Sequence, residues 1–356
     1  MRLRRIIPGV LVLFSLSCSE NEDKKRFDQT QLLTNLSQNV IIPAYQSHLA
    51  NVEILKVKVA GFTTALTVQS LADAKSAWLT AALSWKRAEI FNFGPVDDLS
   101  IETTMDFWPV STTGIENSVA DYDGSSEYLE GIGSNKKGLA AIEYLLFHAD
   151  AESVLTEFSD EKRREYLNLL SEDLTDQIDN LLQVWVTSYV DEFAANTGND
   201  SRASAVLVAN QLLILLDEVK NSKLGAPAGA LSGSGPRPDL VESLFAGNSM
   251  EMIRANLDAI ELVFTGGTGT GFDDYLSAYP RRTDGSEPLH EIIKLQLEKC
   301  REEADFISIP LEEAVNTQAF QVEQLITDLT LLNAYLKTDM MSRLNLVITF
   351  TDNDGD

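Results

Sequence analysis

Apolar residues recur at intervals of three and four along most of the chain, which is the period of an amphipathic α-helix. The spacing is clear where Trp78, Ala82, Trp85 and Glu89 fall at helical intervals. Only the apolar, β-branched run 345–350 suggests extended chain. The pattern predicts helices over 35–59, 70–91, 137–149, 159–196, 201–224, 248–266, 271–279, 286–307 and 317–344.

Three features interrupt this helical pattern. Pro43 lies inside the first predicted helix, where a proline removes a backbone hydrogen bond, so we expect a kink or a break there. Residues 92–137 are long and irregular, and a loop of that length in a compact domain is usually functional or contains short elements. Residues 225–239 are rich in glycine and proline and read as a connector.

Two segments of the chain share a short sequence. Leu-x-Ala-Ile-Glu occurs in GLAAIEYLLF and again in NLDAIELVFT, which aligns Glu143 with Glu261. A chain of 356 residues is long enough for two domains at roughly 100–200 residues each. We therefore expect an all-α protein built from two related, duplicated helical bundles, with an N-terminal domain over 28–199 and a C-terminal domain over 200–356.

Composition adds a strong negative charge to this picture. The formal net charge is −26, from 28 basic and 54 acidic residues. Such a surface repels phosphate backbones, so nucleic acid is excluded as a partner. An acidic surface suits an exported protein or one that attracts cations, although a merely solvated acidic surface is the simpler explanation.

The N-terminus has the layout of a secretory signal. A basic start, MRLRR, precedes an apolar run that is shorter than the roughly 20 residues a membrane-spanning helix needs, and Cys18 follows. We expect residues 1–17 to be a signal peptide and residues 18–27 a tether, with a lipid on Cys18 anchoring the protein to a membrane. The expected location is the periplasm or outer membrane of a Gram-negative bacterium. A lipidated Cys18 leaves Cys300 without a disulfide partner.

Glu143 is the one charged residue in a run, Gly138 to Phe147, that is otherwise apolar or glycine. A helix that is apolar on nearly every side is buried, and a buried carboxylate must be paired, hydrogen-bonded, protonated or metal-bound. Arg87 is one candidate to pair with it. Glu143 is therefore either part of a site or a satisfied structural group.

Further candidate residues lie around the start of the irregular segment. Arg87 and Glu89 lie among aromatic residues, and Asp106 with Trp108 could wall a pocket. A structural alternative exists for each pair: an aromatic core with a salt bridge for the first, and a loop that plugs the end of a bundle for the second. The three histidines are scattered, and none falls in a His-Glu-x-x-His pattern.

An ordered set of motifs resembles the imelysin family, also described as insulin-cleaving membrane peptidase-like proteins. The set comprises VIIPAY, the run W-x6-W-x3-E-x-F-x-FGP, WP, GLAAIEYLLF and the terminal TFTDNDGD. The family is known for a Gly-x-His-x-x-Glu motif that is proposed to bind metal, and this motif falls on Gly138, Ala140 and Glu143. Ala140 stands where the family has histidine, and a methyl group cannot ligate a metal.

The resemblance implies two α-helical domains of duplicated origin, with the motif site near their interface. It also implies a link to bacterial iron uptake at the outer membrane, with outer-membrane uptake components as partners and a divalent metal or iron as the candidate cofactor. Glu143 would be a ligand of such an ion. Because Ala140 lacks a ligand atom, another residue such as His48 would have to complete the site.

Three functions are compatible with these observations. The first is a binding protein that holds a small ligand, such as an iron species, in a pocket between the domains. The second is a metallopeptidase in which Glu143 acts as base or ligand and His48 reaches the pocket. The third is an accessory protein of an outer-membrane uptake system, in which Glu143 is locked in a structural ion pair. We favour the first, because Ala140 removes a ligand that the second requires; its expected pocket residues are Glu143, Arg87, Glu89, Asp106, Trp108, Gly138 and Ala140.

Overall fold

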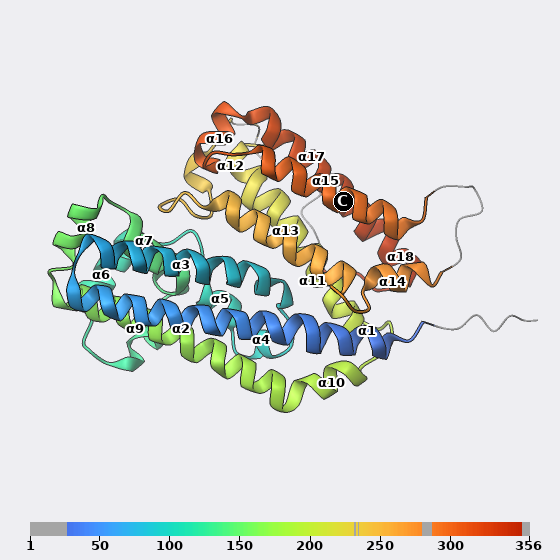
Figure 1. The fold of residues 1–356 in the computed structure, drawn as a ribbon, viewed down its shortest axis with the longest axis horizontal. Helices are drawn as coiled ribbons and strands as arrows, with labels where there is room; N and C mark the ends of the chain where they lie inside the picture. The colour runs from blue at the N-terminus through green and yellow to red at the C-terminus, as the bar shows by residue number, and fades with distance from the viewer. Residues whose placement is uncertain (1–26, 231–232, 234, 280–286, 351–356) are drawn as a thin grey trace, which may run out of the picture.

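The computed structural model of the chain describes residues 27–230, 233, 235–279 and 287–350 (Figure 1). Within these ranges the regular elements are all helices and no strand occurs, so the all-α prediction is confirmed. The run 345–350 is neither helix nor strand over most of its length. The expected signal peptide and lipidated Cys18 lie outside the described residues. None of the described helices combines the length and the hydropathy needed to cross a bilayer.

Long helices form the bundle of the first half of the chain. The helix α2 packs against α3 and α9, and α7 packs against both α3 and α9 (Figure 1). Trp78 is buried in this bundle, and its indole N–H donates to the carbonyl oxygen of Leu139 at 2.8 Å, which ties α3 to α7. The main helices of this half are α1 (Gln29–Asn35), α2 (Ile42–Ala65), α3 (Val68–Ala88), α7 (Gly138–Phe147), α8 (Ala151–Glu157), α9 (Glu161–Val184) and α10 (Val190–Ala195).

Pro43 lies at a helix junction rather than at a break. A π-helical turn, Leu36–Ile41, joins α1 to α2, and Pro43 follows in the first turn of α2. The π-helical turn interrupts the regular i to i−4 hydrogen bonding just before Pro43, which accommodates a residue that has no N–H to donate. A second π-helical turn, Trp185–Tyr189, joins α9 to α10, so the predicted helix 159–196 is a chain of helical segments.

The irregular segment 92–137 contains short helices. They are α4 (Pro95–Asp98), α5 (Ile101–Met105) and α6 (Thr112–Asp121), followed by 3-10 turns at Ser126–Gly131 and Ser134–Lys136. Gly138 begins α7 with a φ of +79°, and a Cβ there would lie 2.5 Å from the carbonyl oxygen of Met105. Only glycine allows this close approach. Gly138 thereby places the start of α7 against the end of α5, next to Asp106.

The second half forms another group of helices. Its long members are α11 (Ser204–Asp217), α13 (Ser249–Thr265), α15 (Leu289–Phe306) and α17 (Ala319–Ala334). Shorter elements connect them: α12 (Ala226–Ala228), α14 (Phe272–Ser277), α16 (Leu311–Thr317), α18 (Met341–Leu344), the π-helical turns Glu218–Gly225 and Tyr335–Met340, and the 3-10 turn Pro238–Leu240.

The two halves meet along α3 and α13, which lie side by side (Figure 1). Buried apolar side chains of both halves form one continuous core. A helical group in each half is consistent with the expected duplication. The charged residues of the candidate site lie close to this contact between α3 and α13.

Candidate functional site

Two lysine side chains are buried where the halves meet. Lys86 lies in the last turn of α3, and Lys223 lies in the π-helical turn that follows α11; their side chains are 1% and 0% exposed. A buried ammonium group is strongly destabilising unless carboxylates and hydrogen bonds compensate for its lost hydration. The surroundings of these two lysines therefore decide whether they can stay charged.

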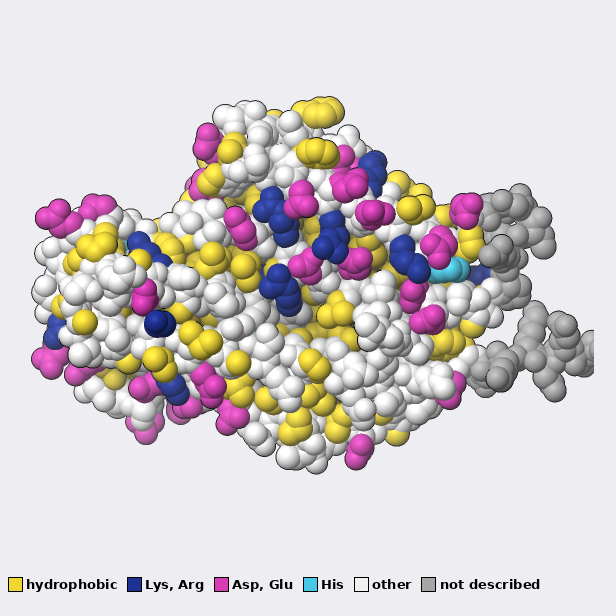
Figure 2. All heavy atoms as spheres, viewed as in Figure 1, with side chains coloured by type: hydrophobic (Ala, Val, Ile, Leu, Met, Phe, Trp, Pro, Cys, Tyr) yellow, Lys and Arg dark blue, Asp and Glu magenta, His cyan; other side chains and the backbone are white. Residues whose placement is uncertain are grey.

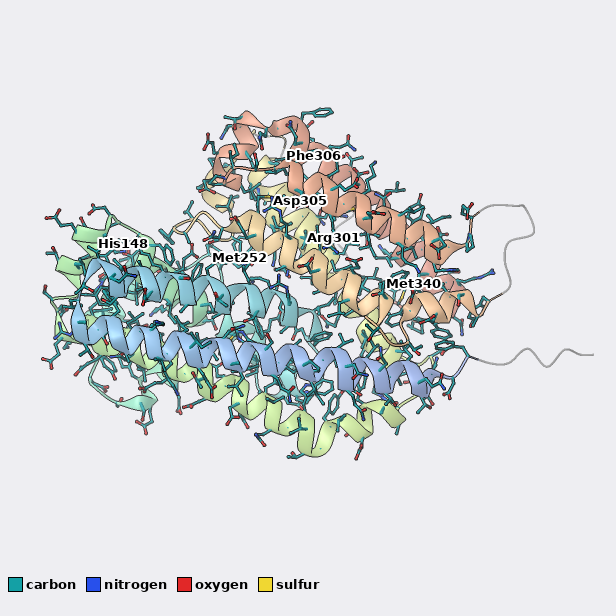
Figure 3. The ribbon with its side chains drawn as sticks, in the orientation of Figure 1. His148, Met252, Arg301, Asp305, Phe306 and Met340 are labelled. Atoms are coloured by element: carbon teal, nitrogen blue, oxygen red, sulfur yellow. The ribbon has the colours of Figure 1, made fainter. Side chains whose placement is uncertain are left out.

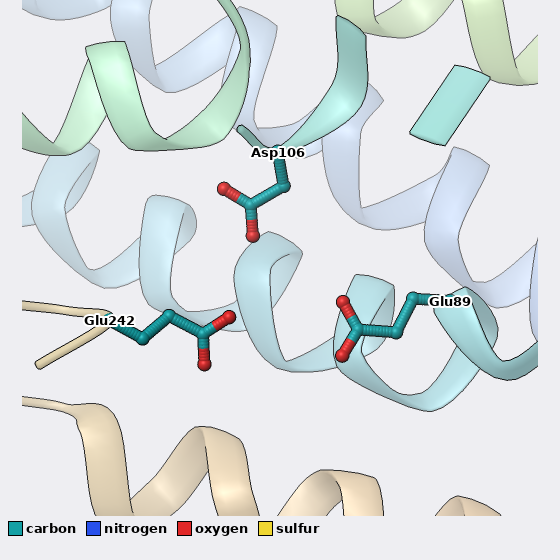
Figure 4. Close-up of side chains that lie close together, drawn as sticks. All are labelled: Glu89, Asp106 and Glu242. Atoms are coloured by element: carbon teal, nitrogen blue, oxygen red, sulfur yellow. The ribbon is translucent and has the colours of Figure 1, made fainter. Parts of the chain in front are cut away.

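Three carboxylates, those of Glu89, Asp106 and Glu242, lie close together beside the two lysines (Figure 4). The Nζ atom of Lys86 lies 2.7 Å from Glu89, 2.8 Å from Asp106 and 2.8 Å from Glu242. Lys223 Nζ lies 2.7 Å from Glu89 and 3.1 Å from Glu242. We call these five residues the interior cluster. The first half supplies Lys86, Glu89 and Asp106, and the second supplies Lys223 and Glu242, so the cluster joins the halves.

The electrostatics of the cluster keep its lysines charged. Burial alone lowers the pKa of Lys86, but the carboxylates of Asp106, Glu242 and Glu89 raise it well above its usual value. Burial raises the pKa of Glu89, but Lys223 and Lys86 outweigh this effect and lower it to about 2. The pKa of Asp106 is raised, because burial outweighs the attraction of Lys86. Ion pairing therefore dominates at Glu89, and desolvation dominates at Asp106.

Asn256 on α13 completes the cluster. Its Nδ2 donates to Glu89 Oε1 at 2.6 Å and to the carbonyl oxygen of Lys86 at 2.8 Å. Its Oδ1 accepts from Lys223 Nζ at 2.9 Å. Because Asn256 is fully buried, these bonds satisfy its amide and fix α13 against the end of α3.

A cavity of about 270 Å³ adjoins the interior cluster. It is bounded by the first half on one side and by α11 and the π-helical turn that follows it on the other. Glu89, Asp106 and Trp108, three of the residues expected from the sequence to form a pocket, all line it. The remaining lining residues are Tyr45, Trp85, Lys86, Ala88, Phe91, Asn92, Val96, Glu102, Thr103, Phe107, Gln211, Ile214, Leu215 and Glu218.

Glu143 lies outside the lining of this cavity and holds a loop of the second half. Its Oε1 accepts hydrogen bonds from Ser243 Oγ at 2.9 Å, from the N–H of Phe245 at 3.0 Å and from the N–H of Ala246 at 2.8 Å. The loop begins next to Glu242 of the interior cluster, so Glu143 helps to position that carboxylate. Burial raises the pKa of Glu143 to about 7, and the nearby charge of Asp106 adds to the effect.

Arg87 does not pair with Glu143, so the pairing proposed from the sequence is wrong. The Arg87 side chain is 48% exposed and lies 3.2 Å from Asp258 of α13. Arg301 of α15, labelled in Figure 3, pairs with the same Asp258 and with Glu261. We call these four residues the rim cluster. They belong to a face of the molecule, over α13 and α15, on which basic and acidic side chains are interspersed (Figure 2).

The residues of the metal motif do not fit a metal ion in this chain. Ala140 offers no ligand atom, and Glu143 Oε1 already accepts three hydrogen bonds. His48 does not complete the site, because it is fully buried between Ser84, 2.9 Å from Nδ1, and Met105, whose sulfur lies 3.5 Å from Nε2. Burial lowers the pKa of His48 to about 3, so its ring stays neutral.

Glu89, Asp106 and Glu242 present a different set of potential ligands. One oxygen of each lies within 4.8 Å of the others, and no other group of this kind occurs in the part of the chain that the structure describes. Carboxylate oxygens at that spacing suit a hard cation. Lys86 Nζ, however, contacts all three carboxylates. The chain's own ammonium group therefore fills the position that an ion would need.

Residues 41–336 match the family model of imelysin, peptidase M75. The chain belongs to the imelysin family. It is 28% identical over 273 residues to iron-regulated protein A of Synechococcus elongatus, a match that covers 74% of this chain and 70% of that protein. The family assignment made from the ordered motifs is thereby confirmed.

Two solved structures share the fold. An iron-regulated protein A precursor from Parabacteroides distasonis superposes with a TM-score of 0.70 at 21% identity, over 86% of this chain and 94% of that chain. An imelysin-like protein from Psychrobacter arcticum superposes with a TM-score of 0.72 at 18% identity, over 90% of this chain and 98% of that chain. At these identities the likeness establishes the fold alone.

Sequence reasoning missed most of the residues around the cavity. Lys86 directly precedes Arg87 in α3, and only the phase of the helix decides which of the two is buried. Lys223 and Glu242 lie in a π-helical turn and in a loop of the second half, and neither has a local signal. Asn256 has a weak sequence signal, because it is a polar residue on the otherwise apolar face of a predicted helix.

Proposed function

We propose that this imelysin-family protein is an exported lipoprotein that binds a small ligand in the cavity between its halves and serves iron uptake. The observation that carries the proposal is the cavity itself, whose wall includes Lys86, Glu89 and Asp106 of the buried interior cluster that joins the halves. Buried charges are destabilising unless fully paired, and such groups in a concave site mark a candidate binding site.

The iron-related part of the proposal rests on relatives. Iron-regulated protein A of Synechococcus elongatus is named for its regulation by iron, and the Parabacteroides distasonis protein carries the same name. Export and a lipid anchor on Cys18 rest on the N-terminal pattern. Outer-membrane iron-uptake components are the partners that such an anchored protein would meet.

Binding fits the cavity better than peptide hydrolysis does. A general base must come within hydrogen-bond reach of the reacting proton. Glu143, the acidic residue of the family motif, is bound to the loop of Ser243 and lies outside the cavity lining. Glu89 lines the cavity, but its two lysine partners and its low pKa make it a weak base.

The test is to block the cavity without disturbing the ion cluster. Thr103 is exposed and lines the cavity, so Thr103→Trp places a large side chain at its wall with little cost to folding. Thr327→Trp is the matched control, because Thr327 is exposed on α17, away from the cavity. Both variants are expressed in a strain that lacks the chromosomal gene, and growth is measured under iron limitation.

We expect the deletion to impair growth when iron is scarce, and we expect wild type and Thr327→Trp to restore it. Thr103→Trp should reach the same protein level and fail to restore growth. Full restoration by Thr103→Trp would show that the cavity is dispensable. An unimpaired deletion strain would show that the protein does not serve iron uptake.

A further inference from the structure

The cavity is surrounded by more negative than positive charge. Glu89, Glu102, Asp106 and Glu218 line it, together with one ammonium group, that of Lys86. Beyond the lining, the negative charge of Glu242 and the positive charge of Lys223 cancel each other. Burial raises the pKa of both Asp106 and Glu218. Even with both of those protonated, the lining would not become positive, so an anionic ligand would find no excess of counter-charge.

The cavity lining also contains a hydrogen-bond acceptor that lacks a donor. Asn92 lines the cavity, and its Oδ1 atom is buried without a hydrogen-bond partner among the described residues. Buried acceptors are nearly always satisfied in folded proteins, so this atom calls for a ligand or water that donates.

Aromatic side chains form much of the remaining wall. Tyr45, Trp85, Phe91, Phe107 and Trp108 all line the cavity. The faces of aromatic rings attract cations, most strongly when the cation is partly removed from water. An aromatic wall beside carboxylates is the usual arrangement for binding an organic ammonium ion, because it suits both the charge and the hydrocarbon that carries it.

A bare metal ion fits this wall less well. The only three carboxylates close enough to share an ion, among the described residues, are those of Glu89, Asp106 and Glu242. Lys86 already contacts all three at 2.7–2.8 Å. What remains for a ligand is the aromatic wall, the acceptor of Asn92 and the carboxylates of Glu102 and Glu218.

We propose that the cavity binds a small organic cation, an alkylamine whose ammonium group donates to the cavity acceptors and whose hydrocarbon packs on the aromatic wall. The proposal rests on the ligand-binding function proposed above and adds the chemical class of the ligand. A volume of about 270 Å³ lies just below the range of typical ligand sites, about 300–1,000 Å³, and therefore suits a small ligand. The charge of the wall excludes anionic ligands, including iron held by carboxylate chelators.

Three probes of equal chain length test the charge selection. Putrescine, 1,4-butanediol and succinate each have a four-carbon chain, and they are cationic, neutral and anionic at neutral pH. Each is titrated into the purified full chain by calorimetry at low salt. We expect saturable binding of putrescine alone. Binding of succinate or butanediol as tight as that of putrescine, or no binding of putrescine, would overturn the proposal.

Variants locate the binding. Glu102→Gln removes one lining carboxylate and should weaken putrescine binding about tenfold, the effect of losing one charge-assisted contact. Glu298→Gln on the exposed face of α15 is the matched control and should leave binding unchanged. Thr103→Trp should abolish binding, whereas Thr327→Trp should not. Equal loss in Glu298→Gln, or unchanged binding in Thr103→Trp, would place the amine elsewhere.

A competition experiment separates an organic cation from a metal ion. Mn²⁺ should leave putrescine binding to wild type unchanged, and displacement of putrescine by Mn²⁺ at stoichiometric concentration would favour a metal site instead. The growth test remains independent of these titrations. If putrescine fails to bind while Thr103→Trp still fails to restore growth, the cavity is used by another class of ligand and only the amine proposal falls.

Discussion

Two clusters of ion-paired side chains join the halves of this imelysin-family protein. Two consecutive residues of α3 belong to different clusters. Lys86 belongs to the interior cluster and is 1% exposed, whereas Arg87 belongs to the rim cluster and is 48% exposed. Both pair with carboxylates of the second half, namely Glu242 and Asp258. The two clusters therefore have the same chemistry and differ in their access to water.

This difference in access changes what each charge does. The interior cluster is largely buried, so water compensates poorly for a missing partner, and removing one member leaves the others short of a counter-charge. In the rim cluster, water and salt compensate for a lost partner, and such exposed pairs typically contribute about 0–1 kcal/mol. The same contrast separates Glu143 from Glu261, which the shared sequence aligns. Glu143 is buried and accepts three hydrogen bonds, whereas Glu261 is partly exposed and pairs with Arg301.

The largest expected effect comes from removing the buried ammonium group. Lys86→Met keeps much of the side-chain length but leaves Glu89, Asp106 and Glu242 without their shared partner. We expect a loss of about 3–5 kcal/mol in the free energy of unfolding, measured with urea. Arg87→Met, one position along, should cost less than about 1 kcal/mol. Equal losses in the two variants would mean that burial does not distinguish the clusters.

The same variant also tests whether Lys86 stands in for a metal ion. With the ammonium removed, three carboxylate oxygens within 4.8 Å of one another should accept a divalent cation. Mn²⁺ should therefore raise the unfolding midpoint of Lys86→Met and leave that of wild type unchanged. A wild-type midpoint that rises as much as that of Lys86→Met would contradict this role of Lys86.

Removing Glu143 should have the next largest effect. In Glu143→Ala, the hydroxyl of Ser243 and the N–H groups of Phe245 and Ala246 lose their acceptor. An unsatisfied buried donor costs roughly 1–3 kcal/mol, and partial rehydration of the loop limits the sum, so we expect a loss of about 3 kcal/mol. Glu261→Ala is the matched control and should cost less than about 1 kcal/mol in the same urea experiment.

The raised pKa of Glu143 predicts a pH dependence of its own. Its folded-state pKa of about 7 lies above the ordinary value of 4.5, so the folded protein binds this proton more tightly than the unfolded chain does. The contribution of this protonation to the free energy of unfolding is complete below pH 4.5 and is lost as the pH rises through 7. The loss is roughly 3 kcal/mol at 1.36 kcal/mol per pKa unit. Glu143→Gln should abolish this change. A difference in unfolding free energy between wild type and Glu143→Gln that stays constant from pH 5 to pH 8 would contradict it.

Most of the fold could be predicted because helical period is a local signal. The long helices fall where the apolar spacing places them, and the burial of GLAAIEYLLF follows from its composition. Glu89, Asp106 and Trp108 were identifiable because they are polar or aromatic residues in a segment without a regular pattern. The fold class and part of the cavity wall were therefore accessible from the residues alone.

The remainder of the site depends on contacts between distant parts of the chain. Lys223 reaches Glu89 across 134 residues, from a π-helical turn whose sequence has no distinctive feature. Arg87 was assigned to the pocket in place of Lys86, because one step along a helix turns a side chain by about 100° and the sequence does not fix that phase. The segments around Glu143 and Glu261 are identical at four aligned positions, yet the surroundings of the two glutamates come from different loops and helices.

The smallest expected effect, at the rim cluster, completes the comparison. Arg301 lies 3.0 Å from Asp258 and also pairs with Glu261, but its side chain is 44% exposed. Arg301→Ala should therefore lower the free energy of unfolding by less than about 1 kcal/mol, because Asp258 keeps Arg87 and water solvates Glu261. The loss should shrink further at high salt, since ions screen exposed charges. The loss in Lys86→Met should stay nearly constant between low and high salt, because its partners are buried. A loss in Arg301→Ala that is large and insensitive to salt would show that the rim cluster is as well shielded from water as the interior cluster.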